Sequence, residues 1–532
     1  MKKTISFLFE VLVTLAILGS CGLSSSINNN TSNQAKVYFV SVSGDDNNTG
    51  LSEAGAWRHI AFAASQAKAG DKVFVKAGKY LAENVVFSNN GTKDKPIIFV
   101  GYQNIVEETP NLNWKYGDSL DASVMPLLDG EDRSKGTAVE LSSKSFIEFK
   151  NFQITNYEIG IYAWGADNLL IENVVGMNFG DIDKDYSGSG IVIGSEAHDN
   201  RIRNCIIQNA AAEGIAIVGD NNILEKSSVY ADDNSTGQKS ATDYYIHVSG
   251  NNNTVKACYA ERIGDLEHGG HGIGIKGHGE NNLIIDSTAK NLSGAFYVRH
   301  SGVKNNMIEN CTVIDSDIGL LIRDGANHNT FKGCQIFNAY DAISFIFSKE
   351  DEKAKTAGND NLITHCLVRG SRHSVISFSR YAYAAKVSNN RFENCVFFGA
   401  AYLFESERSN ENNMMINSII SEIDNYSTGM HAVNFEFAYN DFWDNGFSTP
   451  NGKANISKNP LFVDSENNDF HLKSEYGRWD EKMKIWKMDS LSSPVIDAGN
   501  PESDYENEPK GNGDRINMGL FGNTAFASKT SH

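Results

Sequence analysis

The sequence predicts an all-β solenoid, a right-handed parallel β-helix with an N-terminal helical cap and a C-terminal capping segment. Two observations predict this fold class. A six-residue pattern (Asn, any residue, an apolar residue, two further residues, then Cys or Ser) recurs with a basic period of about 22 to 24 residues, which is typical of a solenoid. A short run with a two-residue alternation of apolar residues precedes most copies, which is typical of a β-strand.

The copies of the pattern are NRIRNC (200–205), NILEKS (222–227), NTVKAC (253–258), NLIIDS (282–287), NMIENC (306–311), NTFKGC (329–334), NLITHC (361–366), NRFENC (390–395) and NMMINS (413–418). Leucine-rich repeats have a similar period, but their leucine consensus is missing. In a parallel β-helix each coil lies about 4.8 Å above the previous one, so equivalent residues stack into ladders. We expect the Asn of the pattern to adopt left-handed turn geometry and to hydrogen-bond along the stack.

Six cysteines share the last position of the pattern, where Ser stands in the other copies. Metal ligation would need cysteine pairs that converge at close spacing, and these are one or two repeats apart. We therefore expect small buried side chains at this position. A disulfide between adjacent coils, Cys311 with Cys334 or Cys366 with Cys395, remains open but is not required. The six are Cys205, Cys258, Cys311, Cys334, Cys366 and Cys395.

The two ends of the chain differ from the repeats. Residues 1–20 have a basic head and a short apolar stretch, which predicts a secretory signal too short to span a membrane. Leu18 to Cys21 resembles the bacterial lipobox, so we expect a lipoprotein anchored through Cys21 in the cell envelope, at the outer membrane; a soluble secreted protein is the alternative. We expect residues 21–34 to form a Ser/Asn-rich tether and residues 35–445 to form the β-helix, with a capping helix near 56–69. Residues 446–532 would then form the C-terminal cap.

The net charge excludes a general nucleic-acid binder. Acidic residues outnumber basic ones by 66 to 47, which gives −19, and nucleic-acid binders normally carry the opposite sign. A polyanionic substrate would therefore need a local basic patch, because distant charges are screened within about 8 Å at physiological salt.

Such a patch is predicted by the alternation of side chains along the strands. When Ile273 and Ile275 point inward, Gly274 and Lys276 point outward. Across neighbouring coils this gives two outer columns: His247, Gly274, Tyr297 and Leu321 in the first, and Ser249, Lys276, Arg299 and Arg323 in the second, with Tyr245 also facing out. The glycines at 272 and 274 would open a cleft above the sheet. A solvated basic stripe is the structural alternative.

Cations in one column suit β-elimination on a uronic acid. Arg299 neutralises the sugar carboxylate and so acidifies the hydrogen at C5, while Arg323 helps to bind it. Lys276 serves as the base if burial and neighbouring cations lower its pKa. Tyr297, Tyr245 or a histidine donates a proton to the departing oxygen.

The run from 272 to 302, GIGIKGHGENNLIIDSTAKNLSGAFYVRHSG, resembles the chondroitinase B and alginate lyase family of parallel β-helix lyases. That family has a catalytic Lys on one coil and a catalytic Arg, in an Arg-His-Gly motif, on the next. Lys276 matches the Lys, and Arg299 with His300 matches the motif, except that Ser301 precedes the glycine. The resemblance implies a polysaccharide lyase. Two calcium-binding glutamates of the family are not matched in 267–271, so an arginine or histidine would replace the metal.

Histidines are dense around these strands, which favours a functional role. We expect His247 and His271 to act in catalysis and His300 to contact substrate, with Tyr245, Ser249 and Arg323. The remaining histidines of the region are His268 and His278.

A calcium ion is the only cofactor that the sequence suggests, and the elimination itself requires none. Asp181, Asp183 and Asp185 alternate like the ligands of a calcium loop. No Glu stands at the closing position of such a loop, so solvated loop acids are the alternative.

Four functions remain open. The first is a lyase on a uronate-containing polysaccharide of the alginate, ulvan or glycosaminoglycan type, acting as a monomer; the second is a dehydratase on a terminal uronate. The third is a glycoside hydrolase, which needs two carboxylates roughly 5 to 9.5 Å apart, for which Asp243, Asp265 and Glu267 are candidates. The fourth is a non-catalytic glycan binder with aromatics such as Tyr162 and Trp164 in its cleft.

Overall fold

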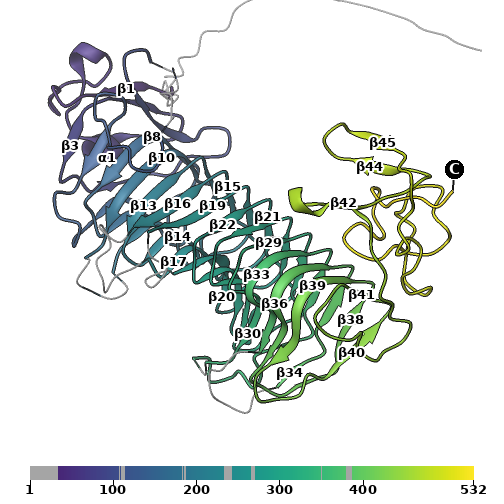
Figure 1. Ribbon diagram of the computed structural model, residues 1–532. Helices are drawn as coiled ribbons and strands as arrows, with labels where there is room; N and C mark the ends of the chain where they lie inside the picture. The colour runs from purple at the N-terminus through teal and green to yellow at the C-terminus, as the bar shows by residue number, and fades with distance from the viewer. Residues whose placement is uncertain are drawn as a thin grey trace, which may run out of the picture. The chain divides into compact units, whose positions relative to one another are not determined.

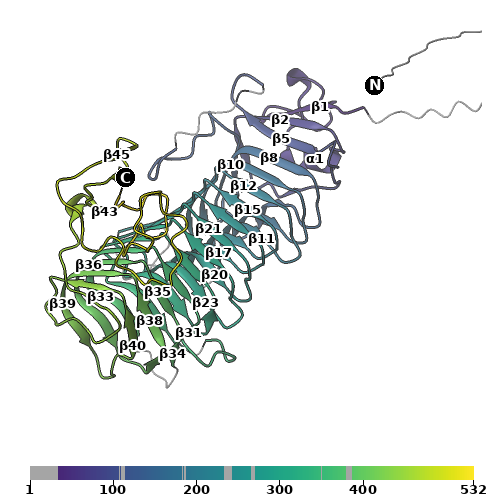
Figure 2. The ribbon, with the colours of Figure 1, turned by 90° about the vertical axis from the view of Figure 1, so that its right-hand side faces the viewer.

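The computed structural model describes residues 34–106, 108, 114–181, 184, 187–232, 242–264, 270–348, 350–378 and 386–531. From Ala35 onward the chain forms one compact unit. Its strands stack in parallel, coil upon coil, from the purple N-terminal coils through teal to the green ones (Figure 1, Figure 2). A coil contributes three strands, and each pairs with its counterpart in the next coil. The predicted all-β class and parallel β-helix are confirmed.

Three parallel sheets make up the coils. The first sheet contains β4 (Val85–Val86), β7 (Thr137–Glu140), β9 (Ile159–Ala163), β11 (Ser189–Ile193), β14 (Glu213–Ile217), β17 (Tyr244–Val248), β20 (His271–Lys276), β23 (Gly294–Arg299), β26 (Ile318–Arg323), β30 (Asp341–Ile346) and the later parts of β33 (Leu367–Phe378), β36 (Val396–Ser406) and β39 (Ile419–Thr428). The second contains β1 (Val37–Val40), β2 (Lys72–Lys76), β5 (Ile97–Tyr102), the starts of β8 (Ile147–Thr155) and β10 (Leu170–Phe179), β12 (Arg201–Arg203), β15 (Ile223–Glu225), β18 (Thr254–Lys256), β21 (Leu283–Ile285), β24 (Met307–Glu309), β28 (Thr330–Lys332), β32 (Leu362–Thr364), β35 (Arg391–Glu393), β38 (Asn413–Ile416) and β40 (Phe435–Ala438).

The third sheet contains β3 (Lys79–Leu81), β6 (Leu127–Asp129), β13 (Ile206–Ala210), β16 (Ser228–Asp232), β19 (Tyr259–Ile263), β22 (Thr288–Lys290), β25 (Thr312–Ile314), β29 (Gln335–Phe337), β41 (Asp441–Trp443) and the remaining parts of β8, β10, β33, β36 and β39. A short sheet at the turns contains β27 (Ala326–Asn327), β31 (Gly358–Asn359), β34 (Val387–Ser388) and β37 (Asn410–Glu411). Inward-facing side chains of the coils form one continuous hydrophobic core.

The Asn of the repeat forms the predicted hydrogen-bonded ladder, but a different residue supplies the left-handed turn. The backbone N–H of Asn282 donates to the Oδ1 of Asn306 at 2.8 Å, and that of Asn306 donates to Asn329 at 3.1 Å. These asparagines are almost fully buried. The positive φ lies one residue earlier, as at Asn281 and Asn305. The expectation that one Asn both turns the chain and forms the ladder was therefore wrong. The side-chain amide of the ladder Asn must point along the stack, and the residue before it adopts the left-handed turn geometry.

The six described cysteines are all buried free thiols, as expected of small core residues. Within the described residues, no disulfide joins Cys311 to Cys334 or Cys366 to Cys395. In copies with Ser, the hydroxyl hydrogen-bonds to the Cys position of the neighbouring coil. For example, Ser227 Oγ accepts from the Cys205 N–H at 3.1 Å.

The predicted capping helix is present but shorter than expected. α1 (Ile60–Gln66) follows the 3₁₀ turn η1 (Glu53–Gly55), and its buried residues Ile60, Ala63 and Ala64 join the core of the coils. The Glu83 carboxylate accepts the Ala61 N–H at 2.8 Å and so satisfies one free amide at the helix start. Residues 67–69 leave the helix, because Ala67 already has extended backbone geometry.

The C-terminal segment packs beside the last coils. It holds the antiparallel pairs β42 (Phe462–Asp464) with β43 (Asp469–Leu472) and β44 (Arg478–Asp480) with β45 (Ile485–Lys487), and the 3₁₀ turn η3 (Ser465–Asn467). Its apolar side chains, such as Phe470, Val495 and Met518, form a second cluster with outward-facing Leu367 and Val396. The segment therefore covers several coils from the side (Figure 1).

Predictions for the first residues fall outside the described part of the chain. The signal at 1–20, the lipidation of Cys21 and most of the tether lie there. In the described ranges, no helix is long and apolar enough to cross a membrane.

Candidate active site

The two predicted outer columns are present on the first sheet. His247 pairs with Gly274, Gly274 with Tyr297, and Tyr297 with Leu321. Lys276 pairs with Arg299, and Arg299 with Arg323, so three cations stand on consecutive coils. Ser249 directly follows Val248, which pairs with Ile275, and so stands beside Lys276.

A third outer column was missed. It consists of Glu213, Tyr244, His271, Gly294, Ile318 and Asp341. Strict alternation had placed Tyr245 on this face, and that placement was wrong: Tyr245 is fully buried in the hydrophobic core. The reason is that two consecutive residues, Tyr245 and Ile246, both face inward at the start of β17. Neighbouring strands share this step, as at Ala295 and Phe296 in β23.

The predicted opening at the glycines is filled. A Cβ at Gly274 would lie 2.5 Å from the Tyr297 ring, so glycine is required here because that ring lies over it. Gly272 faces inward, where a Cβ would meet the Ala295 carbonyl oxygen at 2.3 Å. The two glycines thus allow side-chain packing instead of forming a cleft.

Tyr244 brings Lys276 and Arg299 together. The Lys276 Nζ lies 3.7 Å from the centroid of the Tyr244 ring, a cation–π contact. Arg299 donates through Nη1 to the Tyr244 hydroxyl oxygen. Tyr244 is buried, and it contacts Lys276 through the face of its ring and Arg299 through its hydroxyl.

A carboxylate already bridges the two arginines. Glu350, which follows β30 in the chain, accepts from Arg299 through Oε2 and from Arg323 through Oε1. Two contacts anchor its segment beside the site: the Ser348 hydroxyl donates to Asp324 at 2.6 Å, and the Ser301 N–H donates to Asp351 at 2.7 Å. Arg299 is nearly buried, whereas the Glu350 side chain is 55% exposed. The pair of guanidiniums is therefore arranged to hold a carboxylate at the protein surface.

Burial and charge shift the pKa values of the groups around this pair. Burial lowers the pKa of Lys276, and the neighbouring Arg299 lowers it further, against the opposing effect of Glu213 and Asp243. Burial raises the pKa of Tyr244 to about 12. Burial also lowers the pKa of His271 to about 3, with Arg299, Arg323 and Lys276 adding to the shift. The arrangement thus shifts Lys276 toward its neutral form, and it keeps Tyr244 protonated and His271 neutral.

His271 is packed between aromatic rings. Its ring centroid lies 5.2 Å from that of Tyr244 and 5.3 Å from that of Tyr297. Its Nδ1 is buried without a hydrogen-bond partner. His271 therefore packs directly against Tyr244, and its predicted part in catalysis stays a prediction.

His247 forms the second polar pair of the site. Its Nδ1 lies 3.0 Å from the Glu213 carboxylate. Burial raises the pKa of Glu213, but the hydrogen bond to His247 and the electrostatic effects of His247 and Lys276 lower it by more. Nearby, burial raises the pKa of Asp243. Glu213 and Asp243 both act to raise the pKa of Lys276 and so offset part of the repulsion within the cationic column.

Two residues expected to meet substrate are held by the protein. Tyr297 is fully buried, and its hydroxyl donates to the Ile246 carbonyl oxygen at 3.4 Å. The Nδ1 of His300 accepts the Gly277 N–H at 3.1 Å and so fixes the turn after Lys276. His278 is exposed. The hydroxyl of Tyr297 is directed at a backbone carbonyl inside the protein, whereas the hydroxyl of Tyr244 is directed at Arg299.

Several other predicted residues lie outside the described residues. They are Asp183, Asp185, Asp265, Glu267 and His268. Asp181 is described, and its carboxylate lies 3.2 Å from the Lys184 Nζ.

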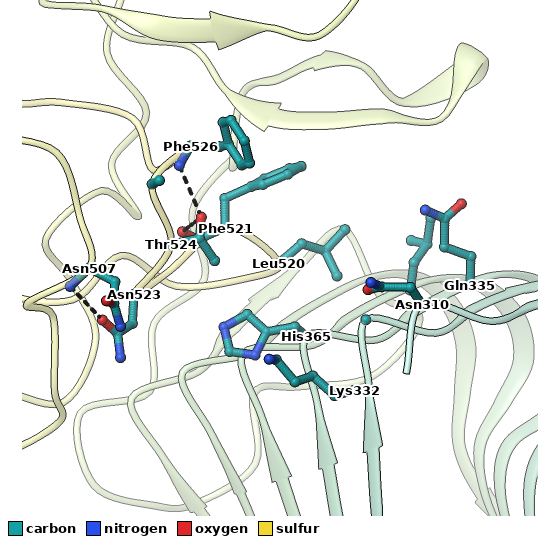
Figure 3. Close-up of a pocket in the computed structure, with 13 residues that line it drawn as sticks. Asn310, Lys332, Gln335, His365, Asn507, Leu520, Phe521, Asn523, Thr524 and Phe526 are labelled. Atoms are coloured by element: carbon teal, nitrogen blue, oxygen red, sulfur yellow. Dashed lines mark hydrogen bonds between the residues drawn. The ribbon is translucent and has the colours of Figure 1, made fainter. Parts of the chain in front are cut away.

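A pocket of about 700 Å³ lies away from this site, where the C-terminal segment meets the second and third sheets. Figure 3 shows Lys332 and His365 of the coils across from Leu520 and Phe521 of the C-terminal segment. The Nε2 of His365 meets the Gly522 carbonyl oxygen at 2.8 Å. None of the residues predicted for the site lines this pocket.

Comparisons with known proteins concern the fold. The model of the family "Right handed beta helix region" matches residues 128–238 and 184–364, and that of "Disaggregatase related" matches 327–499. The chain folds as a right-handed parallel β-helix. No curated protein matches the chain.

Three solved structures with similar folds are carbohydrate-active enzymes. A PL6 family polysaccharide lyase from Pseudopedobacter saltans is 13% identical with a TM-score of 0.42, over 77% of this chain and 94% of that one. The pectate lyase Pel9A is 14% identical with a TM-score of 0.36, over 92% and 96%. A lacto-N-biosidase of the GH136 family from Eubacterium ramulus is 14% identical with a TM-score of 0.35, over 76% and 68%. At these values the likeness concerns the β-helix and not the reaction.

The repeat itself could have revealed part of what sequence analysis missed. Glu213, Tyr244 and His271 each stand at the first position of an equivalent strand, and the pairing of the strands aligns them. Glu350 carries no such signal, because it lies in a connection 51 residues after Arg299 and outside the repeat pattern.

Proposed function

We propose that the protein is a carbon–oxygen lyase that cleaves a uronate-containing anionic polysaccharide or oligosaccharide by β-elimination. The observation that carries the proposal is the carboxylate of Glu350 between Arg299 and Arg323, next to Lys276. A uronate brings the same chemical group, and two guanidiniums bind it with charge-assisted hydrogen bonds.

In this reaction Arg299 and Arg323 neutralise the negative charge of the substrate carboxylate. Withdrawing charge from the carboxylate acidifies the hydrogen at C5 and stabilises the enolate-like intermediate that forms when this hydrogen leaves. Arginine suits the task because its planar fork matches both carboxylate oxygens. Glu350 must move aside for the sugar, and its exposed position allows this.

Lys276 is the base that removes the C5 proton. Its pKa is lowered by burial and by Arg299, which increases the neutral fraction at the pH of reaction. The electron pair of the broken C–H bond forms the C4–C5 double bond, and the C4–O bond to the next sugar breaks. No water is consumed.

Tyr244 is the proton donor to the departing oxygen. Its pKa of about 12 keeps the hydroxyl protonated, and its oxygen accepts from Arg299, which leaves the hydroxyl hydrogen available. The cation–π contact with Lys276 places the base and the acid side by side. After elimination Lys276 carries the C5 proton and Tyr244 has lost one, so a proton exchange with solvent resets the site.

The location of the enzyme rests on the sequence alone. We propose that Cys21 is lipidated after removal of residues 1–20 and anchors the lyase in the bacterial cell envelope. Mass spectrometry of the mature N-terminus tests this: a diacylglyceryl group on Cys21 is expected, and an unmodified cysteine would contradict it.

The reaction is tested by incubating the full chain with alginate, ulvan, chondroitin and pectin, as polymers and as oligomers. We expect ultraviolet absorbance of an unsaturated uronate with one of them, and none with Lys276→Ala. The matched control is Lys256→Ala, an exposed lysine on a different sheet that should leave the rate unchanged. New reducing ends without absorbance would overturn the lyase and indicate a hydrolase.

A further inference from the structure

A second cluster of polar side chains lies on the first sheet, beginning on the coil after Arg323. Asp341 starts β30, His373 lies at the irregular step of β33, and Glu405 lies near the end of β36. Each offers one ligand atom, and these atoms lie within 4.8 Å of one another. We propose that Asp341, His373 and Glu405 bind a divalent transition-metal ion of the zinc type.

The side chains are held in place by neighbours. Asp341 Oδ1 accepts from the Ser374 hydroxyl at 2.6 Å and lies 2.9 Å from the His373 Nδ1. The Ser377 hydroxyl donates to Glu405. His373 stacks on Tyr340, with ring centroids 4.8 Å apart and an angle of 10° between the planes. The hydroxyls of Ser374 and Ser377 are outer partners of the kind that orient metal ligands.

A separate observation indicates that the cluster takes a ligand. The hydroxyl of Ser344 is buried, with the residue 1% exposed, and it has no hydrogen-bond partner. Ser344 pairs with Ser377, and Ser377 pairs with Glu405, so all three side chains stand in one outer column. An unpaired buried hydroxyl costs about 1 to 3 kcal/mol, and a metal with its bound water would supply the missing partner.

The kind of donor selects the kind of metal. One imidazole nitrogen with two carboxylates suits Zn²⁺ and related ions, which are often bound by three protein ligands with one position left for water. Calcium and magnesium prefer oxygen ligands alone. Glu405 is 7% exposed and Asp341 is 9% exposed, so two carboxylates lie close together with little solvent, and a cation would stabilise them.

The site is independent of the proposed lyase reaction. The elimination uses Lys276, Tyr244 and the two arginines, and none of these belongs to the metal cluster. Both lie on one face of the first sheet, so a metal would stand on the coils that follow Arg323.

The test is a metal titration of the full chain after chelator treatment, with Zn²⁺, Mn²⁺ and Ca²⁺ as probes. We expect one Zn²⁺ equivalent to bind. His373→Gln and Glu405→Gln should each weaken Zn²⁺ binding by more than the roughly 10- to 100-fold that loss of an outer partner costs. His328→Gln changes an exposed histidine outside the cluster and should leave it unchanged. Calcium should not compete.

Two outcomes would overturn the site: no Zn²⁺ binding by the parent chain, or equal affinity in the parent and both cluster variants. Should a variant fail to fold, X-ray absorption at the zinc edge of the parent chain decides instead. One imidazole with oxygen ligands is expected there, and a signal from two or more imidazoles or from sulfur would refute the assignment.

Discussion

Replacing Glu350 by Gln should make the protein bind its uronate substrate more tightly. In the structure the carboxylate occupies the place between Arg299 and Arg323 that the substrate carboxylate is proposed to take. The substitution keeps the size of the side chain and removes its charge. Ser348 and Asp351 still anchor the segment, so the fold should persist.

The size of the effect follows from the two ion pairs. Because the Glu350 side chain is 55% exposed, solvent screens both contacts, and each contributes about 0.2 to 1 kcal/mol. Losing both therefore favours the open site by about 0.4 to 2 kcal/mol, which corresponds to a KM about 2- to 30-fold lower. The rate at saturating substrate should change little.

The assay is the initial rate of ultraviolet absorbance against the concentration of the cleaved polymer. Glu352→Gln is the matched control, because it removes the charge of an exposed neighbour in the same segment. A KM for Glu350→Gln that equals the control, or exceeds that of the parent, would refute the assignment of the arginine pair as the carboxylate site.

Three further predictions concern the proton donor, the base and the fold. Tyr244→Phe should lower kcat about 10²- to 10⁴-fold. Tyr297→Phe loses only a 3.4 Å hydrogen bond inside the protein, so its kcat should stay within about tenfold of the parent. A larger loss for Tyr297→Phe than for Tyr244→Phe would exchange the roles of the two tyrosines. The rate should rise with pH through a midpoint below 10.5, because burial and Arg299 lower the pKa of Lys276 and the neutral amine is the active form; a falling rate across the neutral to alkaline range would contradict this. Asn306→Ala should destabilise the coils by about 2 to 4 kcal/mol, since it removes hydrogen bonds to Gly279 and Asn329, and should lower the midpoint of chemical unfolding; the exposed Asn104→Ala should not.

The sequence pattern predicted the register of the site because the repeat and the strand share one geometry. Parallel strands stacked in register turn an alternating sequence into columns, which places Lys276, Arg299 and Arg323 on one line. The position of the buried cysteines follows from the same argument. Both predictions follow from the repeat alone and need no knowledge of contacts between distant parts of the chain.

The errors arose where that regularity ends. At the start of β17 two consecutive residues face inward, which exchanges Tyr245 for Tyr244 on the outer face. The alternation of apolar residues in the sequence gives no sign that two consecutive residues face inward here. Glu350 is brought to the arginines by a connection whose path depends on the Ser301–Asp351 and Asp324–Ser348 contacts, and such contacts do not follow from periodicity.

The central claim is that the C4–O bond of a uronate is broken by elimination at Lys276, and the masses of the products test it most directly. We predict two fragments from an oligomer of the cleaved polymer whose masses add up to that of the substrate, with one fragment unsaturated, and no cleavage by Lys276→Ala. Fragments that together contain one additional water would mean hydrolysis and would contradict the account. A single product that is one water lighter than the substrate would mean dehydration of a terminal uronate and would contradict cleavage.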